Sequence, residues 1–541
     1  MINEMINEDE LDDHLARRIR SMVLKDFGSK AEYQNRCTDI GLSVSTFENY
    51  KDQFIQEVND DAIPELNPGV LIPVILREGL EGVQNRLIPN FLGFLEKASP
   101  KDAAPVAMVR ALADCRYPHE WNPASRLLQR KVIMHVGPTN SGKTYSAIQK
   151  LKKAESGIYC SPLRLLAYEV FVRMNREGIP CRLITGEERR EPEVDGKPLE
   201  LKVGPLGKPH IPLMASTIEM ANISTKYDVA VIDEIQVLTD MQRGWAWTQA
   251  LHGLRAKEIH LCGEPTAVPL VQRLFKVMNE DVEVRTYDRL GSLQVSNVGL
   301  GSKWVNIKKG DCVVTFSRNM IFQVKRDIEQ STGMKCAIVY GGLPPETRAE
   351  QARLFNDPKS GYDVLVASDA IGMGLNLNIN RVVFETLSKF DGKAMRPISI
   401  SQVRQIGGRA GRYQSAYDKG VVTTLHNKDL HHLDKHINML PPPLPSAGIK
   451  PPTNMIEMFS HQFPNVPFSK LWLMFQDCAQ TTTDFHMCQF KDQKVIADSI
   501  ESIPLSVQDR YQLMYAPIQI RDPDLLKTAV DVRPFKCIAR M

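Results

Sequence analysis

Cysteine pairs at C-x-x-C spacing are missing from this sequence. Its ten cysteines are scattered, and several lie in apolar runs that are typical of core strands. A zinc site or a disulfide framework would need closely spaced or systematically paired cysteines. We therefore expect buried free thiols in a protein of a reducing compartment.

Long hydrophobic runs are also missing. No apolar stretch approaches the roughly 20 residues that a membrane-spanning helix needs, so we expect no membrane segment. The N-terminal stretch MINEMINEDELDDHLARRIR is too acidic for a secretory signal or for an arginine-rich transit peptide. We expect either that the protein stays where it is made or that the chain begins after a presequence.

Charge of one sign is not in excess. Charged residues make up 24% of the 541 residues, and the formal net charge is only +3. A chain that is basic overall would carry a broad electrostatic footprint for nucleic acid. Any such affinity must here come from local placement of lysine and arginine. The length predicts about three or four domains of ordinary size.

Two stretches of the chain alternate short β-branched runs with helical segments. The first covers residues 129–286 and contains KVIMHV (131–136), and the second covers 287–440 and contains DVLVAS (363–368). Apolar strands separated by helices predict parallel sheets that are buried on both faces. The fold class is therefore α/β, with two similar domains in tandem.

The flanking segments have helical patterns. Residues 1–128 predict an N-terminal helical domain, and residues 441–541 predict a helical C-terminal domain, which we expect to be truncated. Prolines at 441–443 and 445 predict a linker at the start of the latter. Ser506 and Asp509 have the spacing of a helix N-terminal cap.

A glycine-rich loop follows KVIMHV. The pattern Gly137-x-x-x-x-Gly142-Lys143-Thr144 predicts a phosphate-binding loop between a strand and a helix. Lys143 would reach the β and γ phosphates, and the Thr144 hydroxyl would hold Mg²⁺. The alternative is a glycine-rich turn with an incidental lysine. The predicted nucleotide contacts are Gly137, Pro138, Thr139, Asn140, Ser141, Gly142, Lys143 and Thr144.

A second apolar run ends in two carboxylates, Asp233 and Glu234. Asp233 would hold Mg²⁺ through its water shell, and Glu234 would orient and deprotonate the attacking water. The alternative is that the two acids begin a surface loop. Phosphoryl transfer needs both a metal and a positioned water, so the phosphate loop upstream favours the catalytic interpretation.

Hydrolysis of ATP also needs positive charge from outside the loop. The stretch Gln405-Ile-Gly-Gly-Arg409-Ala-Gly-Arg412 in the second α/β domain offers two guanidinium groups. Arg409 and Arg412 would act as arginine fingers across an interdomain cleft. Surface ion pairs are the alternative role for these arginines.

These motifs belong to a longer ordered set. In chain order it comprises GPTNSGKT (137–144), SPLRLLAYEV (161–170), TGEE (185–188), ASTIEM (215–220), DEIQ (233–236), GEPT (263–266), TFSR (315–318), ASDAIGMGLNL (367–377) and QIGGRAGR (405–412). The set resembles that of superfamily 2 helicases with two RecA-like P-loop domains. With SAGIKP (446–451) downstream, the chain is similar to the suppressor-of-Var family of mitochondrial degradosome RNA helicases.

The resemblance implies which residues line the nucleic acid. They are Ser161, Pro162, Arg164, Thr185, Gly186 and Thr217 in the first domain, and Ser317, Arg318 and Ser368 in the second. Hydroxyls, backbone N–H groups and single arginines can hold phosphates without reading bases. Capping a helix is the alternative role for each serine or threonine.

The resemblance also extends the nucleotide site. It implies Gln236, Asp369, Gly372 and Gly374 as nucleotide-site residues and Gln405 as a catalytic residue. The GEPT stretch would join this site to the nucleic-acid track.

A hairpin is predicted at 387–397, with Asp391-Gly392 at its turn. In related helicases a hairpin in this position separates strands, so Phe390 is a wedge candidate. An ordinary packed hairpin is the alternative.

Two further features bear on ligand binding. The sequence upstream of the loop has no glutamine-type motif that would read adenine. Our hypothesis is that residues 121–130 cover the base instead. The histidine cluster His426, His431, His432 and His436 has no cysteines or carboxylate at ligand spacing, which favours a surface helix over a metal site.

The resemblance implies an ATP-dependent RNA helicase with 3′ to 5′ polarity that uses ATP and Mg²⁺, with Mn²⁺ as a substitute. It implies a location in the mitochondrion, with the nucleus as the alternative. It also implies that the protein acts together with a 3′ to 5′ exoribonuclease such as polynucleotide phosphorylase. Two other hypotheses remain open. One is an ATP-gated RNA clamp for a nuclease, and the other is a helicase that also acts on DNA and RNA–DNA hybrids.

Overall fold

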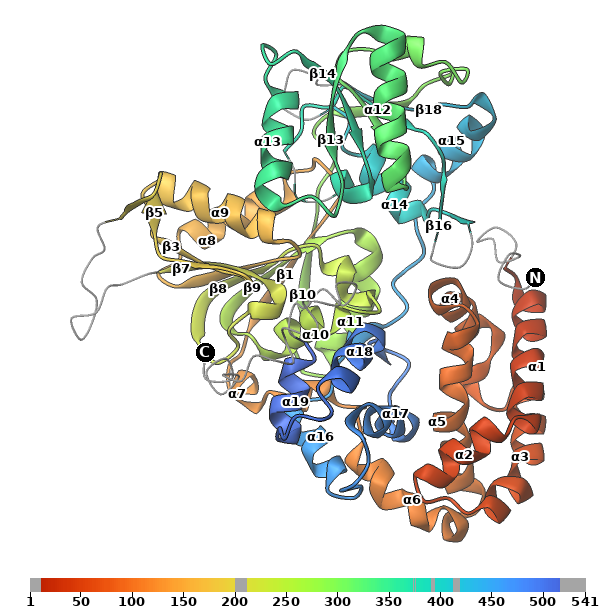
Figure 1. Cartoon of the computed structure of the whole chain (residues 1–541). Coiled ribbons are helices and arrows are strands. Elements are labelled where there is room, and N and C mark those ends of the chain that lie inside the picture. The colour runs from red at the N-terminus through yellow and green to blue at the C-terminus, as the bar shows by residue number, and fades with distance from the viewer. Residues whose placement is uncertain are drawn as a thin grey trace. The chain divides into compact units, whose positions relative to one another are not determined.

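A computed structural model describes residues 11–199, 212–372, 374, 376–390, 395–411 and 419–515 (Figure 1). The chain divides into two compact units. Of the described residues, unit 1 holds 124–237 and 249–444, and unit 2 holds 11–123, 238–248 and 445–515.

The described α-helices have the following bounds: α1 Asp13–Ser29, α2 Ala31–Asp39, α3 Val44–Asn59, α4 Pro68–Glu78, α5 Leu80–Ala98, α6 Pro100–Leu112, α7 Pro123–Arg126, α8 Lys143–Lys152, α9 Arg164–Arg176, α10 Gly244–Gly253, α11 Val268–Lys276, α12 Arg318–Thr332, α13 Pro345–Asn356, α14 Ile400–Gly407, α15 Leu430–Asn438, α16 Thr453–Ser460, α17 Phe468–Cys478, α18 Lys491–Ser499 and α19 Val507–Leu513.

The described strands have the following bounds: β1 Lys131–Val136, β2 Gly157–Ser161, β3 Cys181–Ile184, β4 Arg189–Arg190, β5 Glu193–Val194, β6 Lys197–Pro198, β7 Leu213–Thr217, β8 Lys226–Ile232, β9 Arg255–Gly263, β10 Val282–Thr286, β11 Ser292–Val295, β12 Asp311–Val314, β13 Lys335–Val339, β14 Tyr362–Ala367, β15 Arg381–Phe384, β16 Ser388–Phe390, β17 Met395–Pro397, β18 Lys419–Thr424, β19 Ala447–Ile449 and β20 Phe485–Met487.

The first sheet of unit 1 has the strand order β10-β1-β9-β8-β2-β7-β3-β4. Neighbouring strands are parallel except for the short β3–β4 pair. Helices α8 and α9 cover one face, where Ile148 and Phe171 belong to the same buried cluster as Tyr159 and Val231 (Figure 1). The predicted α/β class is confirmed.

The second sheet has the order β11-β18-β15-β12-β14-β13, and all its neighbours are parallel. Alternate residues of β12 face opposite sides, because Val313 joins the core under α12 whereas Cys312 and Val314 join the core under α13, α14 and α15. Helices on both faces explain why the strands consist of continuous apolar runs.

Edge strands differ from this pattern. The sequence prediction did not include β10, whose residues VEVRT alternate apolar and polar side chains. The strand lies at the edge of the first sheet, where it has one neighbour, β1. An edge strand is partly solvated, so it lacks the continuous apolar run that marked the central strands.

Unit 2 combines N-terminal and C-terminal helices. Phe27 of α1, Phe47 of α3 and Phe91 of α5 form part of an aromatic core, with ring centroids 5.3 to 5.5 Å apart. Arg36 of α2 donates Nε to Asp477 Oδ2 of α17 at 3.1 Å and Nη2 to Oδ1 at 2.5 Å. The two helical segments that the sequence predicted therefore share one unit.

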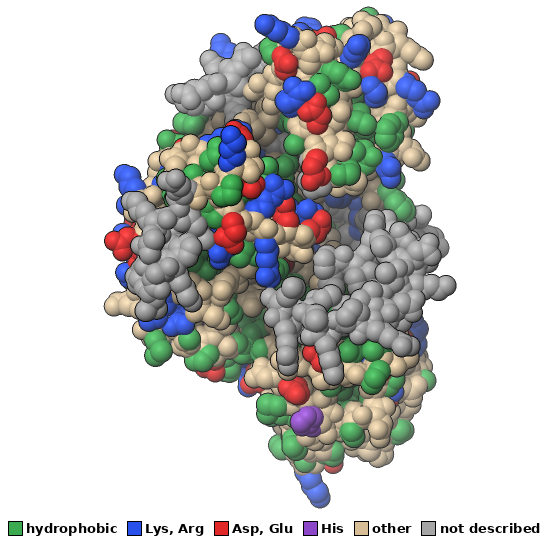
Figure 2. Space-filling view, turned by 60° about the vertical axis from the view of Figure 1, so that its left-hand side comes forward, with side chains coloured by type: hydrophobic (Ala, Val, Ile, Leu, Met, Phe, Trp, Pro, Cys, Tyr) green, Lys and Arg blue, Asp and Glu red, His purple; other side chains and the backbone are tan. Residues whose placement is uncertain are grey.

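Several compositional expectations hold within the described residues. The nine described cysteines are buried and unbonded to one another. None of the described helices combines the length and the hydropathy of a membrane span. On the face shown in Figure 2, Lys and Arg side chains lie among Asp and Glu side chains, and no field of one sign covers the face. This mixture agrees with the small net charge.

Candidate nucleotide and nucleic-acid site

The candidate nucleotide site lies at the carboxyl edge of the first sheet. Strands β1, β9 and β8 are neighbours, so the loops that follow them meet there. Val136 is in register with Gly263, and the Gly137 N–H donates to the Gly263 carbonyl at 3.2 Å. The phosphate loop therefore begins beside the GEPT motif.

The loop lies between a strand, β1, and a helix, α8, as its motif predicted. Asn140 and Gly142 have φ angles of 64° and 79°, and α8 begins at Lys143. Lys143 Nζ donates to the Pro138 carbonyl at 3.1 Å. The buried Ser141 hydroxyl has no hydrogen-bond partner among the described residues. An amine and a hydroxyl at a helix N-terminus suit phosphate oxygens, so the loop fits a nucleoside triphosphate.

Asp233 is held by hydroxyl donors. Thr144 Oγ1 donates to Asp233 Oδ1 at 3.1 Å, and the Tyr159 hydroxyl donates to Oδ2 at 2.8 Å. Burial raises the pKa of Asp233, and the charge of Glu234 raises it further. A cation beside Asp233 would favour its charged form. The Thr144 hydroxyl and the Asp233 carboxylate are oxygen ligands of the kind that Mg²⁺ prefers, so the pair fits this ion.

Glu234 has an unusual backbone conformation. Its φ is 51°, which a non-glycine residue adopts at an energetic cost. Gln236 donates its amide Nε2 to Glu234 Oε2 and accepts at Oε1 from the Glu264 N–H at 3.2 Å. Such strain is typical of residues whose position matters for function.

A contact that the sequence did not predict extends this chain of hydrogen bonds. Ser401 of α14 donates its hydroxyl to the Glu264 carboxylate, with oxygen distances of 3.0 and 3.2 Å. Burial raises the pKa of Glu264. The only sequence signal was that Ser401 lies about one helical turn before Gln405. The contact joins the GEPT stretch to the helix that carries Gln405.

Arg409 and Gly374 belong to the second domain, and their contacts are with Gly372 and with Leu163. Arg409 donates Nε to the Gly372 carbonyl at 3.1 Å, and the Gln405 side chain lies next to Gly372. Gly374 has a φ of 79°, and a Cβ there would approach Leu163 Cδ1 of the first domain to 2.9 Å. Arg412 lies outside the described residues. Contact of either arginine with phosphate stays a prediction.

The predicted nucleic-acid residues of the first domain gather along the same edge. Strands β2, β7 and β3 are neighbours; Ser161 and Thr217 end β2 and β7 in register, and Thr185 follows β3. Ser161 and Thr185 also accept hydrogen bonds from the N–H groups of Leu163 and Glu188, at 3.2 and 3.1 Å. Local turn stabilisation is therefore one of their roles.

The other members of this set adjoin these strand ends. Pro162 follows Ser161, Gly186 is exposed, and Arg164 at the start of α9 pairs with Glu187. An arginine held at the strand ends can release a carboxylate and bind a phosphate instead, because both groups accept two hydrogen bonds from the planar guanidinium.

In the second domain the predicted contacts follow β12 and β14. Ser317 precedes α12, and Ser368 accepts from the Ala370 N–H at 3.1 Å. The Arg318 guanidinium lies 5.2 Å from the ring centroid of Tyr340. Tyr340 was not predicted; it follows β13, the edge strand beside β14. An aromatic ring there can stack on a base.

The predicted hairpin is confirmed as a strand pair, β16 with β17, and its turn at 391–394 lies outside the described residues. Phe390 is in register with Met395, and both side chains are 62% exposed. Asp369 forms an ion pair with Lys389 of β16, at 3.7 Å. The wedge role of Phe390 stays a prediction, and Met395 was not predicted.

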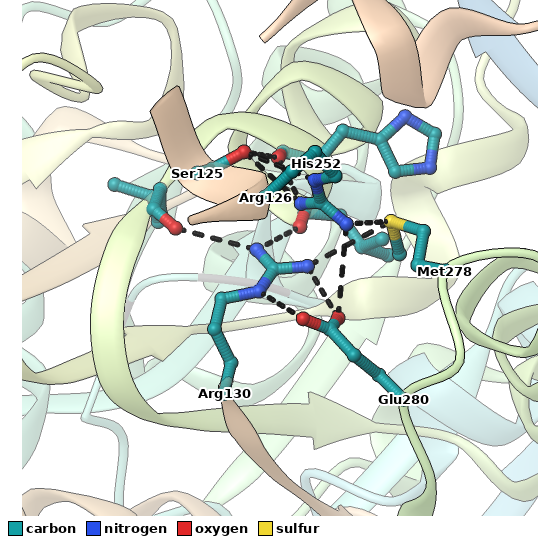
Figure 3. Close-up of polar contacts among 8 residues, drawn as sticks. Ser125, Arg126, Arg130, His252, Met278 and Glu280 are labelled. Carbon is teal, nitrogen blue, oxygen red and sulfur yellow. Dashed lines mark hydrogen bonds and ion pairs between the residues drawn. The ribbon is translucent and has the colours of Figure 1, made fainter. Parts of the chain in front are cut away.

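The hypothesis that residues up to Arg130 cover the base is wrong for Arg126 and Arg130. Arg130 immediately precedes β1 and donates to both carboxylate oxygens of Glu280, while Arg126 donates to the His252 carbonyl (Figure 3). These groups lie at the amino end of β1, roughly 20 Å of strand away from the phosphate loop.

The histidine cluster does not form a metal site in the described structure. His431, His432 and His436 lie on α15, and His426 precedes it. No group of three or more His, Cys, Asp or Glu side chains among the described residues is arranged to hold a metal ion. The surface-helix interpretation is favoured for this cluster, although His436 itself is buried.

A buried histidine pair lies behind the loop. His135 Nε2 and His260 Nδ1 are 2.8 Å apart, and His135 Nδ1 is 2.7 Å from the Tyr287 hydroxyl. Burial, followed by the charge of His260, lowers the pKa of His135 to about 4, and burial also lowers the pKa of His260. Both rings are therefore neutral in the folded protein near neutral pH.

This pair predicts a loss of stability in acid. An unfolded histidine has a pKa of about 6.5, so protons bind preferentially to the unfolded state, and stability falls as pH decreases from about 6.5 towards 4. The slope should be below about 1.4 kcal/mol per pH unit for each ring. Hydrogen exchange of the β1 and β9 amides at pH 7.5 and 5.0, relative to the intrinsic exchange rates at each pH, would measure it for this domain, and His135→Asn should reduce the difference. An equal difference in His135→Asn and in the exposed control His431→Asn would contradict this account.

Known protein families match these motifs. The family described as "DEXQ-box helicase domain of Suv3" matches residues 118–287, "Helicase conserved C-terminal domain" matches 298–414, and "Suv3 C-terminal domain 1" matches 495–530. The "DExH-box ATP-dependent RNA helicase DExH16, mitochondrial" of Arabidopsis thaliana is 44% identical over 409 residues, which cover 76% of this chain and 69% of the relative. The chain belongs to the Suv3 family.

Vertebrate Suv3-family relatives match a longer part of the chain. The "ATP-dependent RNA helicase SUPV3L1, mitochondrial" of Danio rerio is 41% identical over 510 residues, which cover 93% of this chain and 64% of the relative. The protein of the same name from Homo sapiens is 41% identical over 516 residues, which cover 93% of this chain and 62% of the relative. The chain thus spans slightly less than two thirds of these relatives. The superfamily 2 helicase resemblance and the fold of two RecA-like domains are confirmed.

Proposed function

We propose that this Suv3-family chain is an ATP-dependent RNA helicase. The observation that carries the proposal is the placement of two sets of groups along one sheet edge. Loops after β1, β9 and β8 present groups suited to a nucleotide, and the ends of β2, β7 and β3 present hydroxyls and an arginine suited to phosphates. The names of the relatives, which are ATP-dependent RNA helicases, support the same activity.

The chemistry follows from the residues at this edge. Lys143 and the loop N–H groups would bind the β and γ phosphates, and Thr144 with Asp233 would hold Mg²⁺, which supplies charge neutralisation when it is bound. Glu234 would orient water and accept its proton. Gln405, Arg409 and Arg412 would act from the second domain on the developing negative charge.

Strand movement would result from cleft closure and opening. The contacts of Ser401 with Glu264 and of Gly374 with Leu163 lie where the two domains meet, so nucleotide turnover there can alter their spacing. We propose 3′ to 5′ movement, and separation of strands at the Phe390–Met395 pair. We further propose a mitochondrial location, in keeping with the relatives' names, and RNA degradation beside a 3′ to 5′ exoribonuclease.

The test uses duplexes that differ only in their overhang. The whole chain should hydrolyse ATP faster with single-stranded RNA and should release the strand of a duplex that carries a 3′ overhang. Lys143→Ala controls for contaminating ATPases, because it removes the phosphate-binding amine. Unwinding that survives in Lys143→Ala would contradict the proposed site.

Three outcomes of this test separate the competing hypotheses. RNA-stimulated hydrolysis without strand release would indicate an ATP-gated clamp. Preference for a 5′ overhang would contradict the polarity. Equal rates on matched RNA and DNA duplexes would indicate a helicase that is not selective for the 2′-hydroxyl.

A further inference from the structure

The segment that connects the two α/β domains runs along the phosphate loop. The Tyr287 N–H donates to the Val136 carbonyl at 2.8 Å, and the Leu290 N–H donates to the Asn140 carbonyl at 2.9 Å. A Cβ on Gly137 would lie only 2.5 Å from the Tyr287 carbonyl oxygen. Both Tyr287 and Leu290 of the connecting segment are therefore in direct contact with the phosphate loop or the strand end that precedes it.

One side chain of this segment contacts both domains. Arg289 Nη1 donates to the Thr139 carbonyl at 2.9 Å and to the Gly408 carbonyl at 2.8 Å. Its Nη2 donates to the Gly411 carbonyl at 3.1 Å and also to the Ala410 carbonyl. The guanidinium thus joins the phosphate loop to the turn at 408–411.

A second side chain supports the same junction. Asn140 Nδ2 donates to the Gly411 carbonyl at 3.1 Å, and a Cβ on Gly408 would approach the Thr139 side chain to 3.0 Å. The turn is therefore closely packed on the loop. It includes Arg409 and is followed directly by Arg412, the two predicted arginine fingers.

The electrostatics of Arg289 are unusual. Burial is the one cause that lowers its pKa, to about 10. Its Nε is buried without a partner among the described residues, and its four described hydrogen bonds end on neutral carbonyls. Arginines in such positions usually pair with a carboxylate or a phosphate. Since no described carboxylate pairs with Arg289, its positive charge suits a cleft that receives a triphosphate.

We propose that Arg289 is a positioning residue of the ATPase, which holds the 408–411 turn in register with the phosphate loop. The planar guanidinium fork fixes several carbonyls in one geometry, whereas an ammonium is a point charge on a flexible stem. Arginine fingers act only when they are held at the correct distance from the phosphate. This inference rests on the proposed function, and nothing in the motif set includes Arg289.

The test compares Arg289→Ala, Arg289→Lys and the control Arg285→Ala. Arg285 lies four residues before Arg289, on the edge strand β10, and its guanidinium pairs with Glu283 at the surface. The measurements are kcat and KM for RNA-stimulated ATP hydrolysis, binding of single-stranded RNA without nucleotide, and the melting temperature. Together they separate a positioning role from a general effect on folding.

We expect kcat of Arg289→Ala to fall about 100-fold while KM for ATP changes less than about threefold, because the arginines are misplaced rather than the phosphate loop. Arg289→Lys should stay at least about tenfold below wild type, since it lacks the fork. RNA binding without nucleotide and the melting temperature should stay near the wild-type values. Arg285→Ala should match wild type in every measurement.

Several results would overturn the inference. One is a kcat of Arg289→Ala within twofold of wild type, and another is a loss of kcat that only parallels a loss of folded protein. Full recovery in Arg289→Lys would assign the effect to charge and not to positioning. An inactive wild type would overturn the proposed function and this inference together, whereas an active wild type with an unaffected Arg289→Ala would overturn the inference alone.

Discussion

Glu234→Gln should lower kcat for ATP hydrolysis by about 100- to 10,000-fold, the range expected when a general base is removed. The amide cannot accept a proton from water, but it keeps the shape of the side chain and an oxygen that Gln236 can contact. The phosphate loop and Asp233 are unchanged, so ATP should still bind. Steady-state hydrolysis and binding of a fluorescent ATP analogue would measure the two effects separately.

The control for Glu234→Gln is Glu191→Gln in the same domain. Glu191 pairs with Arg182 at the surface, and its side chain is 68% exposed, so the same chemical change should leave kcat within about twofold because exposed ion pairs contribute little. If Glu234→Gln keeps more than a tenth of the wild-type kcat, another group must accept the proton. If it loses nucleotide binding as well, Glu234 has a structural role at the loop.

Glu280→Ala should destabilise the first α/β domain by about 3 kcal/mol, because it leaves a buried guanidinium without its carboxylate. Arg130 has a fully buried side chain and makes hydrogen bonds of 2.8 and 2.6 Å to Glu280 (Figure 3). It also donates to the carbonyls of Leu251 and Leu254 at 2.9 and 3.3 Å. These neutral acceptors remain after the substitution. The loss of unfolding free energy should therefore lie near the low end of the range for a buried ion pair that loses one partner.

The measurement should report on this domain alone, because a chain of several domains does not unfold in two states. Hydrogen exchange of the β1 and β10 amides serves this purpose, since Arg130 directly precedes β1 and Glu280 lies two residues before β10. The control is Glu283→Ala, whose side chain is 47% exposed and pairs with Arg285; it should cost less than about 1 kcal/mol. Equal protection in the two variants would contradict the proposed role of the buried pair.

A matched double variant tests the reason for the cost. Arg130→Met combined with Glu280→Leu removes both charges and leaves apolar side chains. It should be more stable than Glu280→Ala, because no buried charge remains unpaired. A double variant less stable than Glu280→Ala would show that hydrogen bonds of Arg130 to the carbonyls dominate.

Central strands could be predicted well from the sequence. KVIMHV and GIYCS coincide with β1 and β2, because strands buried on both faces must be apolar along their length. The Ser506 cap is confirmed too, since its hydroxyl accepts from the Asp509 N–H, a contact set by local spacing. Such features depend on neighbours within a few residues of one another.

Contacts between distant segments could not be predicted in this way. Arg289 lies in a short segment without a motif, and its partners at Thr139 and Gly408 are 150 and 119 residues away in the chain. Arg130 was assigned to the wrong end of its strand for the same reason. A charged residue can pair with many groups, and only packing selects one of them.

The sequence by itself determined the order of the α/β strands along the chain, the phosphate loop, the acidic pair after β8 and the family of this protein, because each is expressed in residue type and spacing over a short stretch. Only the tertiary structure decided which of these groups meet. Parallel strands bring their carboxyl ends to one edge whatever their separation in the chain, and there Thr144 meets Asp233, Glu264 meets Ser401, and Arg289 joins the two domains.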